Sequence, residues 1–209
     1  MQLQKFILVL ACLLVWWSPV FNSLNSAKAQ VRRYEIECSE KLWNASFDSL
    51  RSQVGLVELT GNNDGKHVEK YLKSVGLKGQ LPYCYAGQYW TFYVAADKLQ
   101  GIPATLLRTA LAAAAFNYAV RFGVKAAPFP QPKDLIFWKF SRRINGHAAR
   151  ITKVKTAGWI ETIEFNTTSG IKGDQREGGG NFVRNRNINY PLGRMNLSGF
   201  IGRKRDGRI

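Results

Sequence analysis

The first half of the chain carries apolar residues at near-helical spacing. Between positions 39 and 54 they fall at Leu42, Phe47, Leu50 and Val54. Ser39 comes just before this run, and a serine there can accept hydrogen bonds from the free amides of a first helical turn. The pattern therefore predicts an amphipathic helix over residues 39–54, capped by Ser39.

Three further helices are predicted downstream. The apolar face of the first consists of Val68, Tyr71, Leu72 and Val75. This helix follows a loop at residues 58–65, rich in Gly, Asn and Asp, and stops at Gly76. A largely apolar helix is predicted over Cys84 to Ala96, and Pro103 opens an alanine-rich helix that runs to about Phe122.

After residue 133 the pattern changes from helical to strand-like. Short segments rich in β-branched or aromatic residues are separated by turn residues, and a glycine-rich loop covers residues 170–180. The predicted strands are Leu135 to Phe140, Ala148 to Val154, Trp159 to Phe165, Asn181 to Asn187 and Ser198 to Ile201. Helices first and strands second predict an α+β fold with segregated layers.

The N-terminus has the order of a secretory signal peptide. Lys5 precedes an unbroken apolar run from Phe6 to Trp17, and a polar stretch then ends in Ala27-Lys28-Ala29. The run is shorter than the roughly 20 apolar residues that a membrane span needs. We therefore expect cleavage after Ala29 and export to the periplasm or the medium, so that the signal segment is the only part to meet the membrane. The alternatives are a retained signal anchor and, less favoured, a lipoprotein modified at Cys12.

The composition is unusual only in its charge. The 209 residues include 30 Lys and Arg against 14 Asp and Glu, a net charge of +16, while the 45% apolar share is that of a globular domain. Signal cleavage would remove Lys5 and Lys28 and lower the charge to +14. Basic residues cluster at 139–143, from Arg184 to Arg194 and in the tail. Such a chain can bind anionic cell-surface polymers, whereas export disfavours nucleic acid as a partner.

Two cysteines, Cys38 and Cys84, would remain in the exported chain. Export permits a disulfide between them. The other interpretation makes Cys38 a small buried residue and Cys84 a free nucleophile. Cys84 lies at a predicted helix start, where the helix dipole and free amides favour a thiolate and can stabilise an oxyanion. A buried structural cysteine is the alternative at that position.

The chain has two histidines in different settings. His67 lies beside Lys66 in a short amphipathic helix, as expected of a solvated surface residue. His147 follows Asn145-Gly146 at a strand start, where a side chain can project toward a cleft. Two histidines and two separated cysteines lack the spacing of zinc ligands, so no metal site is predicted.

Glu164 and Asn166 lie on the strand after His147. Residues two apart on a strand share a face, so either side chain can accept a hydrogen bond from His147 and fix its tautomer. The plainer interpretation of this pair is an anchor for a loop at the sheet's end.

Cysteine, then histidine, then a polar residue is the papain-like chain order, and longer motifs make the resemblance specific. Residues 59–77, Leu-Thr-Gly-Asn-Asn-Asp-Gly-Lys-His-Val-Glu-Lys-Tyr-Leu-Lys-Ser-Val-Gly-Leu, resemble the opening of bacterial CHAP domains, a branch of the NlpC/P60-type peptidoglycan hydrolases. Tyr83-Cys84-Tyr85-Ala86 is similar to their aromatic-Cys-x-Ala helix start, and Asn145-Gly146-His147 to their Gly-His. Residues 163–167, Ile-Glu-Phe-Asn-Thr, are similar to Ile-Glu-Gly-Asn-Thr. Residues 132–137 and 176–186 resemble the family's Pro-Gly-Asp-apolar strand and final hairpin.

The resemblance covers residues 39–201 and implies a papain-like fold with N-terminal helices packed on a C-terminal antiparallel sheet. It implies a cysteine peptidase or amidase that cleaves amide bonds in the peptide part of peptidoglycan. Cys84 would be the nucleophile, His147 the base, and Glu164 or Asn166 the orienting residue, with no cofactor or metal. Around this domain we expect a signal peptide at 1–29, a tether at 30–38 and a basic tail at 202–209.

Four features depart from the family pattern, and the first is the stretch Gly87-Gln88-Tyr89-Trp90 after the cysteine motif. Lys133 and Phe165 each replace a usual glycine, and the alanine-rich helix at 104–122 has no counterpart. A bulky Phe165 can restrict the cleft or alter how Glu164 meets His147. The alternative function is a non-catalytic, basic protein of the same fold that binds the cell wall or another polyanion.

Overall fold

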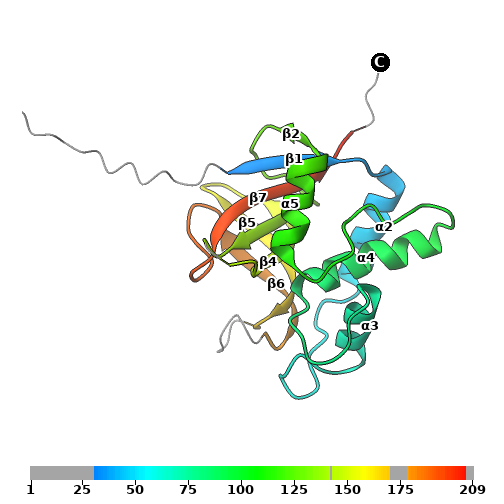
Figure 1. The fold of residues 1–209 in the computed structure, drawn as a ribbon. Helices are drawn as coiled ribbons and strands as arrows, with labels where there is room; N and C mark the ends of the chain where they lie inside the picture. The colour runs from blue at the N-terminus through cyan, green and yellow to red at the C-terminus, as the bar shows by residue number, and fades with distance from the viewer. Residues whose placement is uncertain (1–30, 142, 170–177, 206–209) are drawn as a thin grey trace, which may run out of the picture.

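The computed structural model describes residues 31–141, 143–169 and 178–205. Predictions for the signal peptide and for most of the glycine-rich loop and the tail's end lie outside these residues. The described chain contains four helices and a seven-stranded mixed sheet, which confirms the α+β class (Figure 1). The helices are α2 (Glu40–Arg51), α3 (Lys66–Ser74), α4 (Cys84–Lys98) and α5 (Ala112–Phe122). The strands are β1 (Arg32–Ile36), β2 (Val124–Ala126), β3 (Leu135–Lys139), β4 (Gly146–Val154), β5 (Trp159–Thr167), β6 (Gly180–Asn187) and β7 (Asn196–Arg203).

The strand order in the sheet is β2-β1-β7-β3-β4-β5-β6. Only the β1–β7 pair is parallel, and the other pairs are antiparallel. The sheet is therefore mixed rather than wholly antiparallel as the family resemblance implied. The strand that causes the difference, β1, lies in the segment 30–38 that was expected to be a tether.

That expectation was wrong because an arginine in the segment is buried rather than solvated. Arg33 is 3% exposed, and its Nε donates to the carboxylate of Asp134 at 2.8 Å. Its neighbours Tyr34 and Ile36 are buried in the main core. A buried ion pair inside a short strand has the sequence appearance of a polar tether, which explains the error.

Helices α2, α3 and α4 form where the apolar pattern predicted them. The hydroxyl of Ser39 accepts a hydrogen bond from the amide of Leu42 at 3.2 Å, so it caps α2 as expected. The alanine-rich helix is shorter than predicted, since α5 begins at Ala112 rather than Pro103. Residues 103–111 are held by tertiary contacts instead: the Tyr85 hydroxyl donates to the carbonyl of Leu107 at 3.3 Å, and Leu106 is buried.

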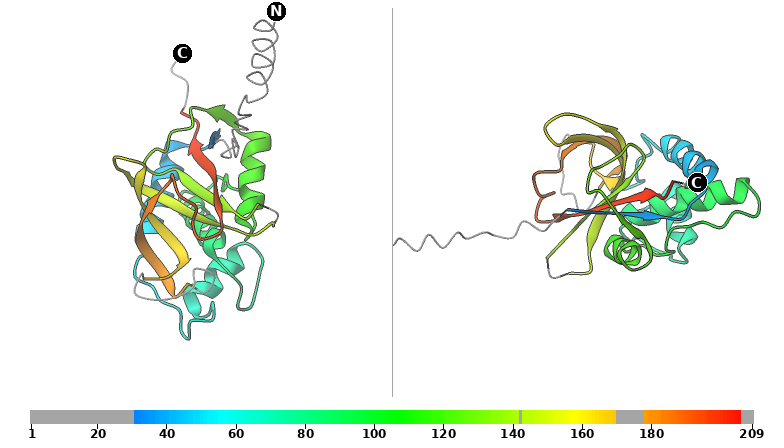
Figure 2. Two further views of the ribbon diagram at one scale, coloured as in Figure 1. Left: turned by 90° about the vertical axis from the view of Figure 1, so that its left-hand side faces the viewer. Right: turned by 90° about the horizontal axis from the view of Figure 1, so that it is seen from above.

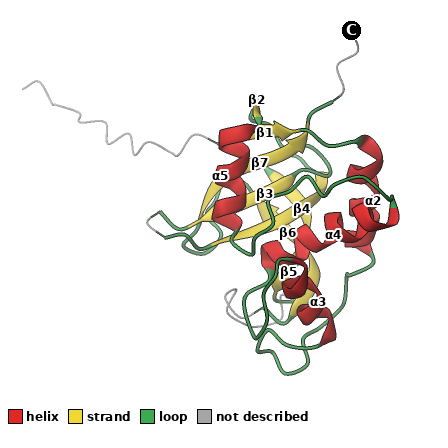
Figure 3. Ribbon diagram, turned by 45° about the vertical axis from the view of Figure 1, so that its right-hand side comes forward, coloured by secondary structure: helices red, strands yellow, loops and turns green. Residues whose placement is uncertain are grey.

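The sheet has two apolar faces, each with its own core. On one face, Leu135 and Phe137 of β3 pack with residues of α2, α4 and α5. The intervening residues Ile136 and Trp138 point the other way and pack with β4, β5, β7 and Leu192. Figure 3 shows α2, α3 and α4 gathered on one side of the strands, and Figure 2 shows the same arrangement from two further directions. Two-residue alternation in β3 thus separates a helix-covered face from a second face.

Candidate active site

Cys84 is the first residue of α4, and its side chain lies against the start of β4. The thiol is 7% exposed, and its Sγ lies 3.7 Å from the carbonyl oxygen of Gly146. The backbone amides of Tyr85 and Ala148 also interact with this sulfur. The first amides of a helix have no partner within the helix, so α4 directs free donors at the thiol.

β4 brings His147 to the same place. Its Nε2 lies 3.0 Å from Oε2 of Glu164 on β5, while the ring also forms a hydrogen bond with the Cys84 thiol. Because Nε2 meets the carboxylate, Nδ1 is the ring nitrogen left for sulfur. The Trp138 ring lies beside the imidazole, with 6.0 Å between ring centroids. Three predicted site residues, Cys84, His147 and Glu164, are therefore in one continuous contact chain.

Glu164 is fully buried and held from several sides. Nε of Arg186 donates to its Oε1 at 2.8 Å, and a terminal guanidinium nitrogen donates to Oε2 at 2.7 Å. The hydroxyl of Thr162 donates to Oε1 at 2.7 Å. Such a bidentate pair fixes a carboxylate in position as well as in charge. Sequence reasoning assigned no role to Arg186, although an arginine on the strand beside β5 is the natural partner for a buried acid.

The charges of these groups depend on one another. Burial disfavours the Cys84 thiolate, but the hydrogen bond and charge of His147 outweigh it and hold the pKa of the thiol below its usual value. Burial alone would lower the pKa of His147, yet Cys84 and Glu164 raise it to about 9. Arg186 and His147 likewise overcome burial and keep the pKa of Glu164 far below normal. These contacts thus shift the thiol toward thiolate and the ring toward imidazolium, beside a carboxylate held in its ionised form.

Asn166 lies outside this contact chain. Its Nδ2 donates to Oδ1 of Asn63 at 2.9 Å, and its Oδ1 accepts from the amide of Gly178 at 3.0 Å. The expectation that Asn166 shares a face with Glu164 was wrong, because Asn166 has φ 52° and the β5–β6 register shifts between Glu164 and Thr167. The break in alternation turns Asn166 toward two loops, where it acts as the anchor that was the plainer interpretation.

Phe165 does not narrow the surroundings of His147. It is fully buried on the helix-covered side, with its ring centroid 4.9 Å from that of Tyr71. A Cβ built on Gly87 of α4 would come within 2.3 Å of this ring. Phe165 stands where the family pattern has a glycine between Glu164 and Asn166. The space for its ring is provided by Gly87 of α4, which has no side chain.

A hydrogen-bonded brace that sequence reasoning missed connects both sides of the site. The buried Glu58 accepts from the Tyr83 hydroxyl at 2.9 Å and from the amide of Asn63 at 2.7 Å. Tyr83 directly precedes Cys84, and Asn63 binds Asn166, two residues after Glu164. The loop at 58–65 therefore ties the start of α4 to the end of β5.

The remaining candidates take no part in this contact chain. Cys38 and Cys84 are both free, and Cys38 is buried in the main core as predicted.

His67 is only partly exposed, and its Nε2 is buried without a hydrogen-bond partner, so the expectation of a solvated side chain was wrong. Its ring packs edge-on against Tyr71, 6.1 Å between centroids, which accounts for the burial. Within the described ranges, no three His, Cys, Asp or Glu side chains are grouped so that they could hold a metal.

Comparison with known proteins adds no relative: no family model, no curated protein and no solved structure matches this chain. Among the described residues, no helix has the length and apolarity to cross a bilayer. The site therefore has to be interpreted from its own chemistry. A thiolate at a helix start, an imidazolium and a buried carboxylate are the groups needed to attack a carbonyl carbon and protonate a leaving amine.

Proposed function

We propose that the protein is an exported, papain-like cysteine hydrolase that cleaves amide bonds in the peptide part of peptidoglycan. The observation that carries this proposal is the contact chain from Cys84 through His147 to Glu164, built on a helix start and two adjacent strands. The choice of peptidoglycan stems rests on the sequence motifs at 59–77 and 83–86, and on the signal-like N-terminus.

In the proposed reaction the Cys84 thiolate attacks the scissile carbonyl carbon. The tetrahedral oxyanion is stabilised by free amides at the start of α4, that of Cys84 among them. The C–N bond then breaks, and the imidazolium of His147 gives its proton to the departing amine. Water, deprotonated by His147, attacks the resulting thioester, which releases a carboxylic acid and restores the thiol. Glu164 keeps the ring oriented and stabilises its positive form throughout.

Digestion of purified cell-wall sacculi by the mature chain tests the proposal. Mass spectrometry of the soluble products should show cleaved peptide stems and should identify the bond. Cys84→Ala should abolish product formation, whereas Cys38→Ala is the matched control and should retain it. Full digestion by Cys84→Ala would disprove the cysteine mechanism.

Thiol labelling supplies a second, activity-independent measurement. A thiolate-forming Cys84 should react with iodoacetamide at neutral pH much faster than Cys38, because burial raises the pKa of the Cys38 thiol. His147→Ala should slow the labelling of Cys84 specifically. Equal labelling rates of Cys84 in the wild-type and His147→Ala proteins would remove the support for an activated thiol.

A second candidate function is non-catalytic binding to an anionic cell-wall polymer. The specific observation is that Arg143 and Arg194 are exposed and form no ion pair within the described part of the chain. Together with the net charge of +16 they offer a cationic surface to a polyanion. An unreactive Cys84 combined with retained wall binding would favour this function.

A further inference from the structure

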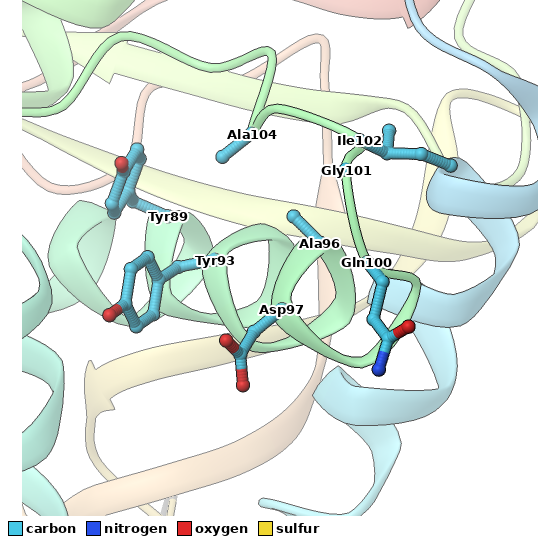
Figure 4. A pocket seen from close by; sticks show the side chains of 8 residues that line it. All are labelled: Tyr89, Tyr93, Ala96, Asp97, Gln100, Gly101, Ile102 and Ala104. Atoms are coloured by element: carbon cyan, nitrogen blue, oxygen red, sulfur yellow. The ribbon is translucent and has the colours of Figure 1, made fainter.

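A pocket lies along the second half of α4, beyond the end that carries Cys84 (Figure 4). It is formed by that helix and the loop that follows it, and its volume is about 530 Å³. It is a shallow hollow that is open to solvent rather than an enclosed cavity. None of its lining residues belongs to the contact chain of Cys84, His147 and Glu164.

Two tyrosines one helical turn apart form one wall. Tyr89 and Tyr93 are stacked, with 6.4 Å between ring centroids and 25° between ring planes. Tyr89 is 6% exposed and is fixed in the helix packing, whereas Tyr93 is 50% exposed. The pair is therefore a flat aromatic surface with a rigid base and an accessible outer ring.

Polar groups stand at the next turn and in the loop. Asp97 is exposed and forms no ion pair with any described residue, although the chain holds 30 Lys and Arg. Gln100 follows with φ 45°, and its amide carries both donors and acceptors. Ala96 and Ala104 contribute small apolar side chains to the rest of the lining, and Ile102 contributes a larger one.

We propose that this pocket binds a sugar ring with an N-acetyl group, as found in the glycan strand of peptidoglycan. A pyranose has one face of C–H bonds that packs on an aromatic ring, and hydroxyls at its edge that need both donors and acceptors. Tyr93 supplies the first, Asp97 and Gln100 supply the second, and the small apolar side chains suit the acetyl methyl group. The unpaired carboxylate disfavours phosphorylated and other anionic ligands.

This assignment deepens the proposed function and rests on it for the choice of sugar. Tyr89 and Asp97 follow Cys84 by five and thirteen residues, which is about 8 to 20 Å along the helix axis, and at 3.6 residues per turn they lie on the face of α4 away from the thiol. An extended peptide covers up to about 3.6 Å per residue, so a stem of a few residues spans that distance. A stem attached to a glycan in the pocket would have to pass round the start of α4 to reach the thiol.

Calorimetric titration of the mature Cys84→Ala chain with chitotetraose, a soluble oligomer of N-acetylglucosamine, tests the assignment without requiring catalysis. Tyr93→Ala and Asp97→Asn should each weaken binding about 10-fold, an effect of the size expected for a lost ring contact or charged hydrogen bond. Tyr118→Ala, at an exposed tyrosine on α5, is the matched control and should leave the affinity unchanged. Cellotetraose, which lacks the acetyl groups, should bind more weakly.

Three outcomes would overturn the assignment: no binding of chitotetraose, an unchanged affinity in folded Tyr93→Ala, or preferential binding of a simple amine such as lysine. In the active chain, Tyr93→Ala should raise KM on intact sacculi and leave the hydrolysis of a free, sugar-less stem peptide unaltered. Failure of all hydrolysis with intact chitotetraose binding would contradict the proposed function and leave the sugar site standing. Hydrolysis with no effect of Tyr93→Ala would do the reverse.

Discussion

At the residue scale, the site depends on a carboxylate that is both buried and fully engaged. Glu164 is 0% exposed, and its two oxygens are shared among His147, Arg186 and Thr162. A buried charge without partners would be unstable, so Arg186 is what allows Glu164 to remain ionised beside the imidazole. Glu164, rather than Asn166, is accordingly the residue placed to orient His147.

We predict that substitutions at these two positions differ in cost. Glu164→Gln loses the charge that stabilises the imidazolium and should slow sacculus digestion by roughly 100-fold, a few kcal/mol, in line with other triad orienters. Asn166→Ala leaves the ring contacts intact and should slow it by less than about 10-fold. His147→Ala should be nearly as damaging as Cys84→Ala, because the leaving amine then departs unprotonated. Digestion rates of the purified, folded variants give the ranking, and a larger loss for Asn166→Ala than for Glu164→Gln would contradict it.

The pH dependence of the reaction follows from the same contacts. The proposed reaction needs a deprotonated Cys84 and a protonated His147. The pKa of the thiol is held below normal while that of His147 is raised to about 9. Activity should therefore rise as the thiol deprotonates, persist through neutral pH, and fall as the pH passes about 9 and the ring loses its proton. The kcat/KM profile measures this, and Glu164→Gln should move the alkaline limb to lower pH; a rate still rising at pH 10 would argue against the ion pair.

At the scale of elements, β5 shows what a sequence pattern can and cannot predict. Its alternation places Ile163 and Phe165 under the helices and Thr162 and Glu164 on the other side, as a two-residue period requires. The position of Cys84 at a helix start was predictable from the apolar run that follows it, and that of His147 at a strand start from the Asn145-Gly146 turn before it. The left-handed conformation of Asn166 was not, since it arises from tertiary hydrogen bonds to Asn63 and Gly178 rather than from local preference.

The contact between Phe165 and Gly87 gives a prediction about packing. Gly87→Ala puts a methyl group against the phenyl ring and should destabilise the fold by about 1–3 kcal/mol, the usual cost of overpacking. Phe165→Leu in the same chain should recover part of that loss. Urea unfolding monitored by circular dichroism measures both, with Gly179→Ala as the control because its Cβ would meet nothing within 4 Å. Strictly additive effects of the two changes would mean that the two sites are not coupled.

At the scale of the whole molecule, the largest difference between the sequence-based prediction and the structure concerns β1. β1 precedes the first described helix in the sequence, but in the sheet it lies between β2 and β7. Its pairing partners, Val124–Ala126 and Asn196–Arg203, are distant in sequence. No local pattern of apolar residues predicts such a strand pairing. The helices and the five strands from β3 to β7 were predictable because each carries its own apolar pattern, whereas β2, like β1, was not predicted. The brace through Glu58 and the Arg186 contact depend on long-range proximity, which a single sequence does not reveal.

The excess of positive charge predicts that binding to an anionic cell wall depends on salt concentration. Electrostatic attachment to an anionic wall weakens as salt screens the charges, with a Debye length of about 10 Å at 0.1 M and about 3 Å at 1 M. Co-sedimentation of the Cys84→Ala chain with purified walls should therefore fall steeply between 0.05 and 0.5 M NaCl. Hydrolysis of a small neutral stem peptide should change little over that range, because Cys84, His147 and Glu164 are buried.

Replacing the exposed Arg143 and Arg194 by Gln should reduce the salt dependence of sedimentation while leaving peptide hydrolysis intact. Wall binding that is insensitive to salt would mean that attachment depends on specific contacts, such as the sugar pocket, rather than on net charge.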